Sequence, residues 1–424
     1  MTEKLQLAIV GCGGMGHRHL YGLAELHRTG LSPFELVGAC DPVLDNAHSL
    51  ADQAADLLGA RPAPVADLDD LTALGEIHAV DVCTLPRVHH TVGIEALERG
   101  WHVMCEKPMG LTTRACNLMR RAADASGKVL SVSENYRRDP MNRLAKALLD
   151  QGIIGQARLM IQNTLGGGDR MTISVWRHQK NSSGLLLDVG VHFADIMEYF
   201  LGPAVSAYAQ TRLYEKIRQN PMAGRAPEEG GSSPGGVYER WQTDMPAEFE
   251  ATAEDAAYAT ILFGSGAVAQ YIEDHAVRGQ NVWKRAIYGS RGSMELPGDR
   301  SGKRLALFAA GEAPVDDARL LERVPDFHLD ETTAVLFGGE RLFEYDFSFP
   351  EIDRKVIAIE YGEFGTAVLQ GRPPEVDAEQ GARSVALSYA LMESQVAGRH
   401  VSVDEVLDDR VNAYQEEIND SLGL

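Results

Sequence analysis

The sequence predicts an α/β fold in which a doubly wound parallel sheet is followed by an α+β domain with a mostly antiparallel open sheet. Apolar strand-like segments alternate with helical segments through residues 5–132, whereas strand-like segments later follow one another without helices between them. A glycine-rich turn directly follows the first apolar segment, residues 5–10. The change of pattern predicts two domains, residues 1–132 and residues 133–424.

The first domain is expected to alternate strands and helices. Residues 78–85 have the β-branched, apolar character of a central parallel strand, which ends at Pro86. Gly100 ends the helix that follows. Ligands of such a sheet bind beyond the carboxyl ends of its strands, where Pro86, His90 and Lys107 fall. Strands are expected at 5–10, 34–39, 78–85, 101–105 and 129–132, and helices after Asp41, at 91–99 and at 112–126.

The second domain is expected to hold consecutive strands, which predict an antiparallel sheet whose exposed face forms an interface between subunits. Residues 221–236 are too rich in Gly, Pro and Ser for a strand and predict a mobile surface loop or a lid. Helical periodicity near the C-terminus predicts helices that return to cover the sheet. The strands are expected at 157–163, 204–212, 256–263, 267–274 and 285–288, and the late helices at 360–369 and 381–397.

Composition narrows the class of protein. The chain has 424 residues, 44% hydrophobic and 24% charged, which is typical of a globular protein, and its N-terminus lacks the features of a secretory signal. We therefore expect a cytoplasmic protein with no membrane partner. The net charge of −21 opposes binding to nucleic acid. The five cysteines are odd in number and lack CxxC spacing, so we expect reduced thiols and no metal site.

The glycine-rich turn predicts a dinucleotide site. It contains Gly11-x-Gly13-x-x-Gly16 between a strand and a helix, and the N-terminus of a helix offers unpaired N–H groups and a partial positive charge to a pyrophosphate. Asp41 ends the second strand, where a carboxylate accepts hydrogen bonds from the ribose and repels a 2′-phosphate. The sequence thus favours NAD over NADP. The alternative for Asp41 is an aspartate that starts a turn before Pro42.

A second motif carries groups suited to proton transfer. If the chain is helical from Val189, Asp188 and His192 lie four residues apart on one face. An alcohol that loses a hydride also loses its hydroxyl proton, which needs a base near neutrality and a group that stabilises the developing charge on oxygen. His192 suits the first task and Lys107 the second, while Asp188 orients His192 or binds a hydroxyl. Singly, each has a structural alternative: a core histidine, or a simple Glu106-Lys107-Pro108 turn.

The order of these motifs resembles the Gfo/Idh/MocA family, that of glucose–fructose oxidoreductase and inositol dehydrogenase. The resemblance covers nearly the whole chain and implies an NAD-dependent oxidoreductase with a Rossmann domain, in which Lys107, Asp188 and His192 are catalytic. Two departures are Arg87, where members often have asparagine, and the long segment 221–236. The residues expected to bind the cofactor are Gly11, Gly13, Gly14, Met15, Gly16, Asp41, Leu85, Pro86, His90, Glu106 and Lys107.

The resemblance also implies a sugar, a polyol or a sugar derivative as substrate. From the predicted antiparallel sheet we expect a homo-oligomer, dimer or tetramer, formed through the C-terminal sheet. Arg170, Arg177 and Lys180 stand close together in an acidic chain and weakly indicate an anionic sugar. The alternative for this segment is a solvated loop. The residues expected to contact the substrate are Lys107, Arg137, Trp176, Arg177, His178, Asp188 and His192.

Three functions remain open on the sequence alone. The first is a net NAD-dependent dehydrogenase or reductase of a sugar or polyol. The second is an NAD-dependent glycoside hydrolase, which oxidises a ring hydroxyl transiently, eliminates the aglycone and returns the hydride, and whose substrate could be a sulfo- or carboxy-sugar glycoside. The third is a non-catalytic NAD-binding sensor. In such a sensor we would expect other residues at the catalytic positions of the family, but this chain has Lys107, Asp188 and His192 there.

Overall fold

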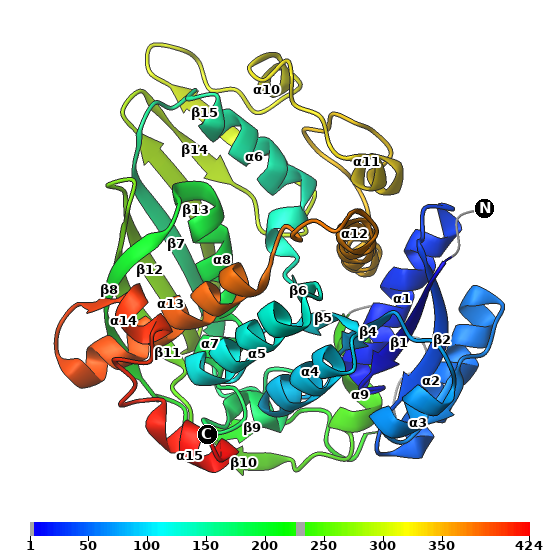
Figure 1. Cartoon of the computed structure of the whole chain (residues 1–424). Helices are drawn as coiled ribbons and strands as arrows, with labels where there is room; N and C mark the ends of the chain where they lie inside the picture. The colour runs from blue at the N-terminus through cyan, green and yellow to red at the C-terminus, as the bar shows by residue number, and fades with distance from the viewer. Residues whose placement is uncertain (1–3, 226–233) are drawn as a thin grey trace. The chain divides into compact units, whose positions relative to one another are not determined.

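The computed structural model describes residues 4–225 and 234–424 and divides the chain into two compact units. Residues 4–135, 234–238 and 350–382 form the first unit, and residues 136–225, 239–349 and 383–424 form the second. The expected division after residue 132 differs from this one because residues 350–382 pack with the N-terminal part of the chain. Figure 1 shows the elements of both units along the chain.

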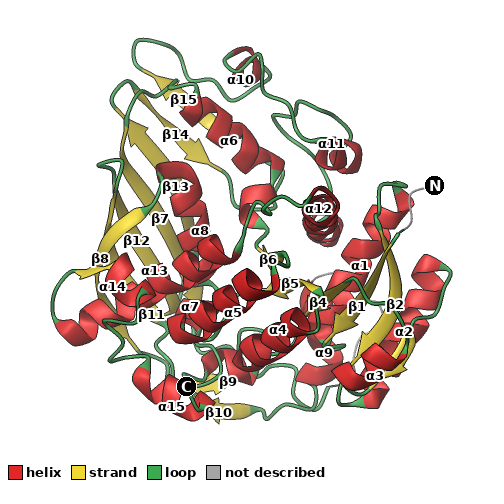
Figure 2. Ribbon diagram, in the orientation of Figure 1, coloured by secondary structure: helices red, strands yellow, loops and turns green. Residues whose placement is uncertain are grey.

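The first unit is built on a six-stranded sheet with the order β3-β2-β1-β4-β5-β6, in which every pair is parallel. Helices lie between successive strands, as Figure 2 shows, which confirms the predicted doubly wound sheet. Its strands are β1 (Leu5–Val10), β2 (Phe34–Cys40), β3 (Ala63–Val65), β4 (Ala79–Val82), β5 (His102–Glu106) and β6 (Leu130–Ser133). Its helices are α1 (Gly14–Arg28), α2 (Leu44–Leu58), α3 (Leu68–Ala73), η1 (Pro86–Val88), α4 (His89–Glu98), α5 (Thr113–Ser126) and α12 (Phe349–Gln370).

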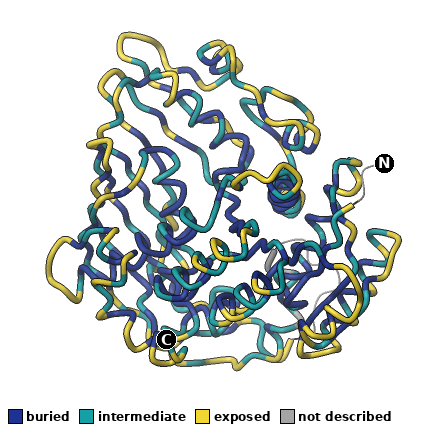
Figure 3. Tube along the Cα trace, viewed as in Figure 1, coloured by how far each residue is buried: buried dark blue, intermediate teal, exposed yellow. Residues whose placement is uncertain are grey.

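The central strands form the core of this unit. All four residues of β4 are buried, and much of the core of this unit is dark blue in Figure 3. Helix α12 joins this core from far along the chain. A Cβ atom on Gly22 of α1 would lie 2.3 Å from the Ile357 side chain, and the rings of Phe34 and Phe364 stack at 5.7 Å. The glycine therefore permits close contact between α1 and α12.

The second unit is built on an eight-stranded sheet with the order β15-β14-β13-β7-β12-β11-β8-β16. Only β7 and β12 pair in parallel, so the predicted mostly antiparallel sheet is confirmed. Its strands are β7 (Ala157–Gly167), β8 (Ala204–Arg212), β11 (Ala256–Phe263), β12 (Val268–Val277), β13 (Val282–Gly289), β14 (Gly292–Leu296), β15 (Ala306–Ala309) and β16 (Val401–Ser402), beside a separate pair, β9 (Ile217–Gln219) and β10 (Glu248–Glu250).

Helices cover one face of this sheet. A Cβ atom on Gly190, the first residue of α8, would lie 3.3 Å from Glu273 of β12, which shows how closely the helix approaches the strand. The opposite face carries exposed apolar side chains, among them Leu262 and Tyr288. The helices of the unit are η2 (Tyr136–Arg138), α6 (Pro140–Asp150), η3 (Val175–His178), α7 (Leu185–Asp188), α8 (Gly190–Leu201), α10 (Arg319–Glu322), α11 (Glu331–Phe337), α13 (Ala378–Ala397), α14 (Val403–Leu407) and α15 (Glu416–Leu422), and α9 (Pro234–Gln242) runs from the first unit into the second.

The segment predicted as a loop, residues 221–236, is only partly a loop. Residues 221–224 form a turn, residues 226–233 lie outside the described part of the chain, and residues 234–236 begin helix α9. The prediction was wrong for these last three residues because proline is favoured in the first turn of a helix, where its missing N–H costs nothing. All five cysteines are buried free thiols. Among the described helices, none has the length and apolar character that a membrane span requires.

Candidate active site

The glycine-rich turn after β1 closes through tight backbone contacts. Gly11 has φ +96°, and a Cβ atom there would lie 2.7 Å from the Cys83 backbone. A Cβ atom on Gly16 would lie 2.2 Å from the Gly11 carbonyl oxygen. Both positions therefore require glycine. The outcome is a strand that leads directly into the N-terminus of α1, as the motif predicts.

The same turn fits a pyrophosphate. Gly13 is the N-cap of α1, and a glycine has no side chain that could accept a hydrogen bond from the first turn of the helix. A Cβ atom on Gly13 would have no neighbour within 4 Å among the described residues, so the backbone is open on that side. N–H groups of a helix N-terminus with an open approach are a site for a phosphate anion. The residues present thus fit the cofactor that the sequence predicts.

Asp41 is fixed beside this turn. One carboxylate oxygen accepts a hydrogen bond from the Cys12 N–H at 2.8 Å, and the other accepts one from the Val43 N–H at 2.8 Å. The first bond ties the end of β2 to the glycine-rich turn, and the second is the local turn that we considered as the alternative. Both interpretations of Asp41 are therefore compatible with the geometry. A carboxylate held here would present its negative charge to the ribose of a bound dinucleotide.

Lys107 follows the last residue of β5, Glu106, and a buried network holds that glutamate. His19 of α1 donates to Asp81 at 2.8 Å and to Glu106 at 3.0 Å, and the Tyr361 hydroxyl donates to Asp81. His19, Asp81 and Tyr361 are fully buried. The network joins α1, β4, β5 and α12, and it fixes the backbone from which Lys107 projects.

The neighbours of His19 and Glu106 in this network shift the pKa values of both groups. Burial alone would lower the pKa of His19, but the charge of Asp81 raises that pKa well above its ordinary value, so the imidazole is protonated. Burial alone would raise the pKa of Glu106, but His19 and Lys107 together lower it. Ligand atoms of His19, Asp81 and Cys83 lie within 4.8 Å of one another. Because both nitrogens of His19 donate to carboxylates, the imidazole has no lone pair for a metal ion.

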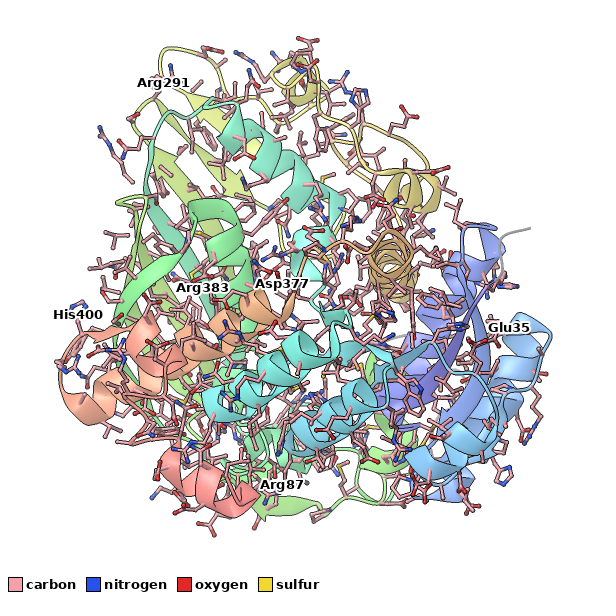
Figure 4. All side chains as sticks on the ribbon, viewed as in Figure 1. Glu35, Arg87, Arg291, Asp377, Arg383 and His400 are labelled. Carbon is pink, nitrogen blue, oxygen red and sulfur yellow. The ribbon has the colours of Figure 1, made fainter. Side chains whose placement is uncertain are left out.

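The other predicted cofactor residues lie after β4. Pro86 begins η1 and is buried, Leu85 is exposed, and Arg87, labelled in Figure 4, follows them. His90 is buried, and its Nδ1 has no hydrogen-bond partner among the described residues. Burial, assisted by His89 and Arg87, lowers the pKa of His90, so its ring is neutral near pH 7. An unpartnered polar atom in this position suits a contact with a ligand.

Asp188 lies at the end of α7 in a buried ion pair. Arg177 donates from Nε to its carboxylate at 2.8 Å and from Nη1 to the Ser174 hydroxyl at 3.1 Å. Arg177 and Asp188 are both at least nine-tenths buried. The pair fixes the orientation of the Asp188 carboxylate. It also means that a substrate anion would have to compete with Asp188 for the Arg177 guanidinium.

His192 lies in the first turn of α8 and is fixed by stacking. Its ring lies parallel to that of Tyr136, with centroids 4.4 Å apart and an interplanar angle of 11°. The helix predicted to carry both Asp188 and His192 is divided at Val189 into α7 and α8, each of them helical. Asp188 and His192 belong to the second unit, whereas Lys107 belongs to the first.

Several predicted substrate contacts have partners within the second unit. Arg137 forms two hydrogen bonds to Asp195, at 2.8 and 2.5 Å, and Lys180 forms an ion pair with Glu417 at 2.9 Å. His178 is buried and accepts a hydrogen bond from the Thr172 N–H. Burial, with the charge of Arg218 next, lowers the pKa of His178 to about 3, so its ring is neutral. Two of the three cations that weakly indicated an anionic substrate, Arg177 and Lys180, are thus already paired with carboxylates.

Trp176 is only partly buried, and its ring contacts a cation. The Arg177 guanidinium carbon lies 4.2 Å from the centroid of the Trp176 ring. Such a cation–π contact fixes the indole at the start of the segment that leads to α7. The contact of Trp176 with a sugar face stays a prediction.

Sequence reasoning missed an acid–base pair on β12. Glu273 is fully buried, and its carboxylate lies 2.7 Å from Nε2 of His275 and also accepts the Tyr271 hydroxyl. These three residues alternate along one face of the strand, the face that Gly190 of α8 approaches. The available signal was a period-two pattern that places a glutamate on the apolar face of a strand. His275, partly exposed, is thus a further titratable group of this unit.

Comparison with protein families matches both parts of the chain. Residues 5–134 match the model of an oxidoreductase family with an NAD-binding Rossmann fold. Residues 146–403 match the C-terminal alpha/beta domain of the same oxidoreductase family. The two matches follow one another in the order of the two predicted domains and together cover most of the chain.

Individual relatives are sugar dehydrogenases. The chain is 27% identical to levoglucosan dehydrogenase of Pseudarthrobacter phenanthrenivorans over 319 residues, which cover 73% of this chain and 78% of that protein. It is 26% identical to D-glucoside 3-dehydrogenase of Escherichia coli over 348 residues, which cover 77% and 87%. A solved structure of levoglucosan dehydrogenase in complex with NADH has a TM-score of 0.72 at 22% identity, covering 94% of this chain and 99% of that one. The last similarity shows a shared fold.

Proposed function

Since the chain belongs to the oxidoreductase family with an NAD-binding Rossmann fold, we propose that it oxidises a hydroxyl-bearing carbon of a sugar, a polyol or a sugar derivative. The observation that carries the proposal is the pair of fixed side chains in the second unit, Asp188 beside Arg177 and His192 beside Tyr136. A carboxylate and an imidazole held in place suit a substrate with several hydroxyl groups. The named relatives act on levoglucosan and on D-glucosides, which supports this substrate class.

The proposed roles balance the charge of the reaction. Oxidation of a secondary alcohol to a ketone removes a hydride from carbon and a proton from oxygen. NAD, when bound, supplies the acceptor for the hydride. His192 accepts the hydroxyl proton, and the Lys107 ammonium stabilises the negative charge that develops on oxygen. Asp188, fixed by Arg177, orients the hydroxyl groups of the substrate.

We expect Asp41→Ala to weaken discrimination against NADP. The carboxylate of Asp41 repels a 2′-phosphate, and its removal also breaks the hydrogen bond from the Cys12 N–H. The expected result is a ratio of NADPH to NADH dissociation constants that falls about tenfold or more, because repulsion of the 2′-phosphate by one carboxylate is worth about 1–2 kcal/mol here. Fluorescence titration with NADH and NADPH measures both constants. A wild-type protein that prefers NADPH would overturn the role given to Asp41.

A panel of free sugars, polyols and aryl glycosides tests the proposed function. The purified protein is incubated with NAD and each compound, while the absorbance of NADH and of the released aglycone is followed. Continuous NADH formation with at least one free sugar or polyol supports the proposal. Release of aglycone without net NADH would instead support a glycoside hydrolase. Neither signal with any compound would support a protein that binds NAD without catalysis.

The interface between subunits stays a prediction. The exposed apolar residues Leu262 and Tyr288 on the eight-stranded sheet support a homo-oligomer, dimer or tetramer, formed through this face. A cytoplasmic location likewise stays a prediction from the sequence.

A further inference from the structure

Tyr238 lies against the first turn of α1, at the predicted pyrophosphate site. It belongs to helix α9, more than 200 residues along the chain, and its side chain is 9% exposed. A Cβ atom on Gly14 would lie 2.3 Å from Cδ1 and 2.4 Å from Cε1 of Tyr238. The phenol ring therefore lies directly on the Cα atom of Gly14, in the space that any other residue would fill.

The ring is held in this position by a buried ion pair. Arg18, one turn further along α1, donates to the Tyr238 hydroxyl at 3.4 Å. The same guanidinium donates two hydrogen bonds to Asp353 of α12, at 3.0 and 2.6 Å. The Tyr238 hydroxyl also lies 3.7 Å from the sulfur of Met15. Arg18, which Asp353 holds in place, thus fixes the hydroxyl end of the ring.

The surroundings of the two adjacent glycines differ sharply. Gly13 is open, since a Cβ atom there would have no neighbour within 4 Å among the described residues, whereas Gly14 is covered by Tyr238. The anion therefore approaches on the side of Gly13, and the ring closes the side of Gly14. Exclusion of water from one side strengthens hydrogen bonds between the N–H groups and a phosphate.

We propose that Tyr238 is a cofactor-binding residue that forms one wall of the dinucleotide site and slows the release of NAD and NADH. The proposal uses the family's NAD binding and the geometry around Gly14, and it does not depend on the substrate. It assigns to helix α9 a function in the Rossmann unit. In the chain this helix comes after strands β7, β8 and β9 of the second unit. A slowly released nucleotide would remain bound through more than one turnover when the reaction returns its hydride.

The test is the rate at which NADH leaves the protein. Purified protein is loaded with NADH, mixed in a stopped-flow instrument with excess NAD, and followed by the loss of NADH fluorescence. We expect Tyr238→Ala to accelerate release about tenfold, which corresponds to about 1.4 kcal/mol and lies within the range of an aromatic contact. Tyr238→Phe keeps the ring and loses the hydroxyl, with its contacts to Arg18 and to the Met15 sulfur, so release should accelerate less than threefold.

Two further variants separate this role from a general effect on helix α9. Trp241→Ala removes another aromatic side chain from the same helix and should leave the release rate unchanged. Tyr238→Leu keeps an apolar side chain in the space above Gly14 and should fold even if Tyr238→Ala does not, with release accelerated a few-fold. An unchanged rate in both Tyr238→Ala and Tyr238→Leu, or equal acceleration in Trp241→Ala, would overturn the proposal. Because no sugar is present, failure here leaves the proposed oxidation untouched.

Discussion

Lys107→Ala is expected to lower kcat by a hundredfold or more while NAD still binds. The reason is that the ammonium stabilises charge that develops on the substrate oxygen in the transition state, an interaction usually worth about two to three orders of magnitude in rate. The backbone around residue 107 should persist, because the network of His19, Asp81, Glu106 and Tyr361 holds the end of β5 without the lysine side chain. Steady-state kinetics with the sugar found in the panel and NADH titration measure the two effects separately.

Two variants control this result. Lys303→Ala removes an exposed lysine of the second unit and should retain wild-type kcat. Lys107→Arg keeps the positive charge at a different length, so it should retain more activity than Lys107→Ala. A Lys107→Ala protein with nearly normal kcat would remove Lys107 from the proposed mechanism, and one that loses NAD binding as well would show a role in the cofactor site instead.

His192→Ala is expected to have an effect of similar size. Loss of the base removes a proton acceptor from the transition state, and general-base catalysis contributes about two to four orders of magnitude. The variant also removes the ring that stacks on Tyr136, so His192→Phe serves as a partner variant that keeps an aromatic ring there and cannot accept a proton. Both variants should lose at least a hundredfold in kcat with unchanged NADH affinity.

The control for His192 is His400→Ala. His400, labelled in Figure 4, is an exposed histidine whose ring stacks on Tyr208 at 5.4 Å. Its replacement should leave kcat unchanged. If His192→Phe restored most of the activity lost in His192→Ala, the stacking and not the proton transfer would explain the effect, and His275 beside Glu273 would become the candidate base of this unit.

The sequence predicted elements well where periodicity and end signals agree. β8 and β11 have the predicted bounds, because alternating side chains face a core on one side only. β14 and β15 were missed, since these short strands are flanked by glycine and charged residues and are fixed by pairing with β13 and each other. Helix α12 proved longer than the predicted 360–369 because its first turns pack on α1, a contact that no local pattern encodes.

The sequence singled out candidate site residues but not their surroundings. Motif spacing pointed to Gly11, Gly16 and Asp41, whose close contacts in the turn follow from local backbone chemistry. It gave no means of knowing that Arg177 pairs with Asp188 or that His19 holds Glu106. Such partners are 11 and 87 positions apart, and only the fold brings them together. Glu273, His275 and Tyr238 were missed because their interest depends on a neighbouring residue. Glu273 and His275 contact each other along β12, and Tyr238 of α9 contacts Gly14 of α1.

The central claim is that this oxidoreductase takes a hydride from a hydroxyl-bearing carbon of a carbohydrate, and isotope transfer tests it most directly. The most active sugar or polyol from the panel is prepared with deuterium on every carbon and incubated with NAD, and the NADH formed is analysed by mass spectrometry. We predict NADH that carries one deuterium atom per molecule. NADH without deuterium, or no NADH with any carbohydrate of the panel, would contradict the claim.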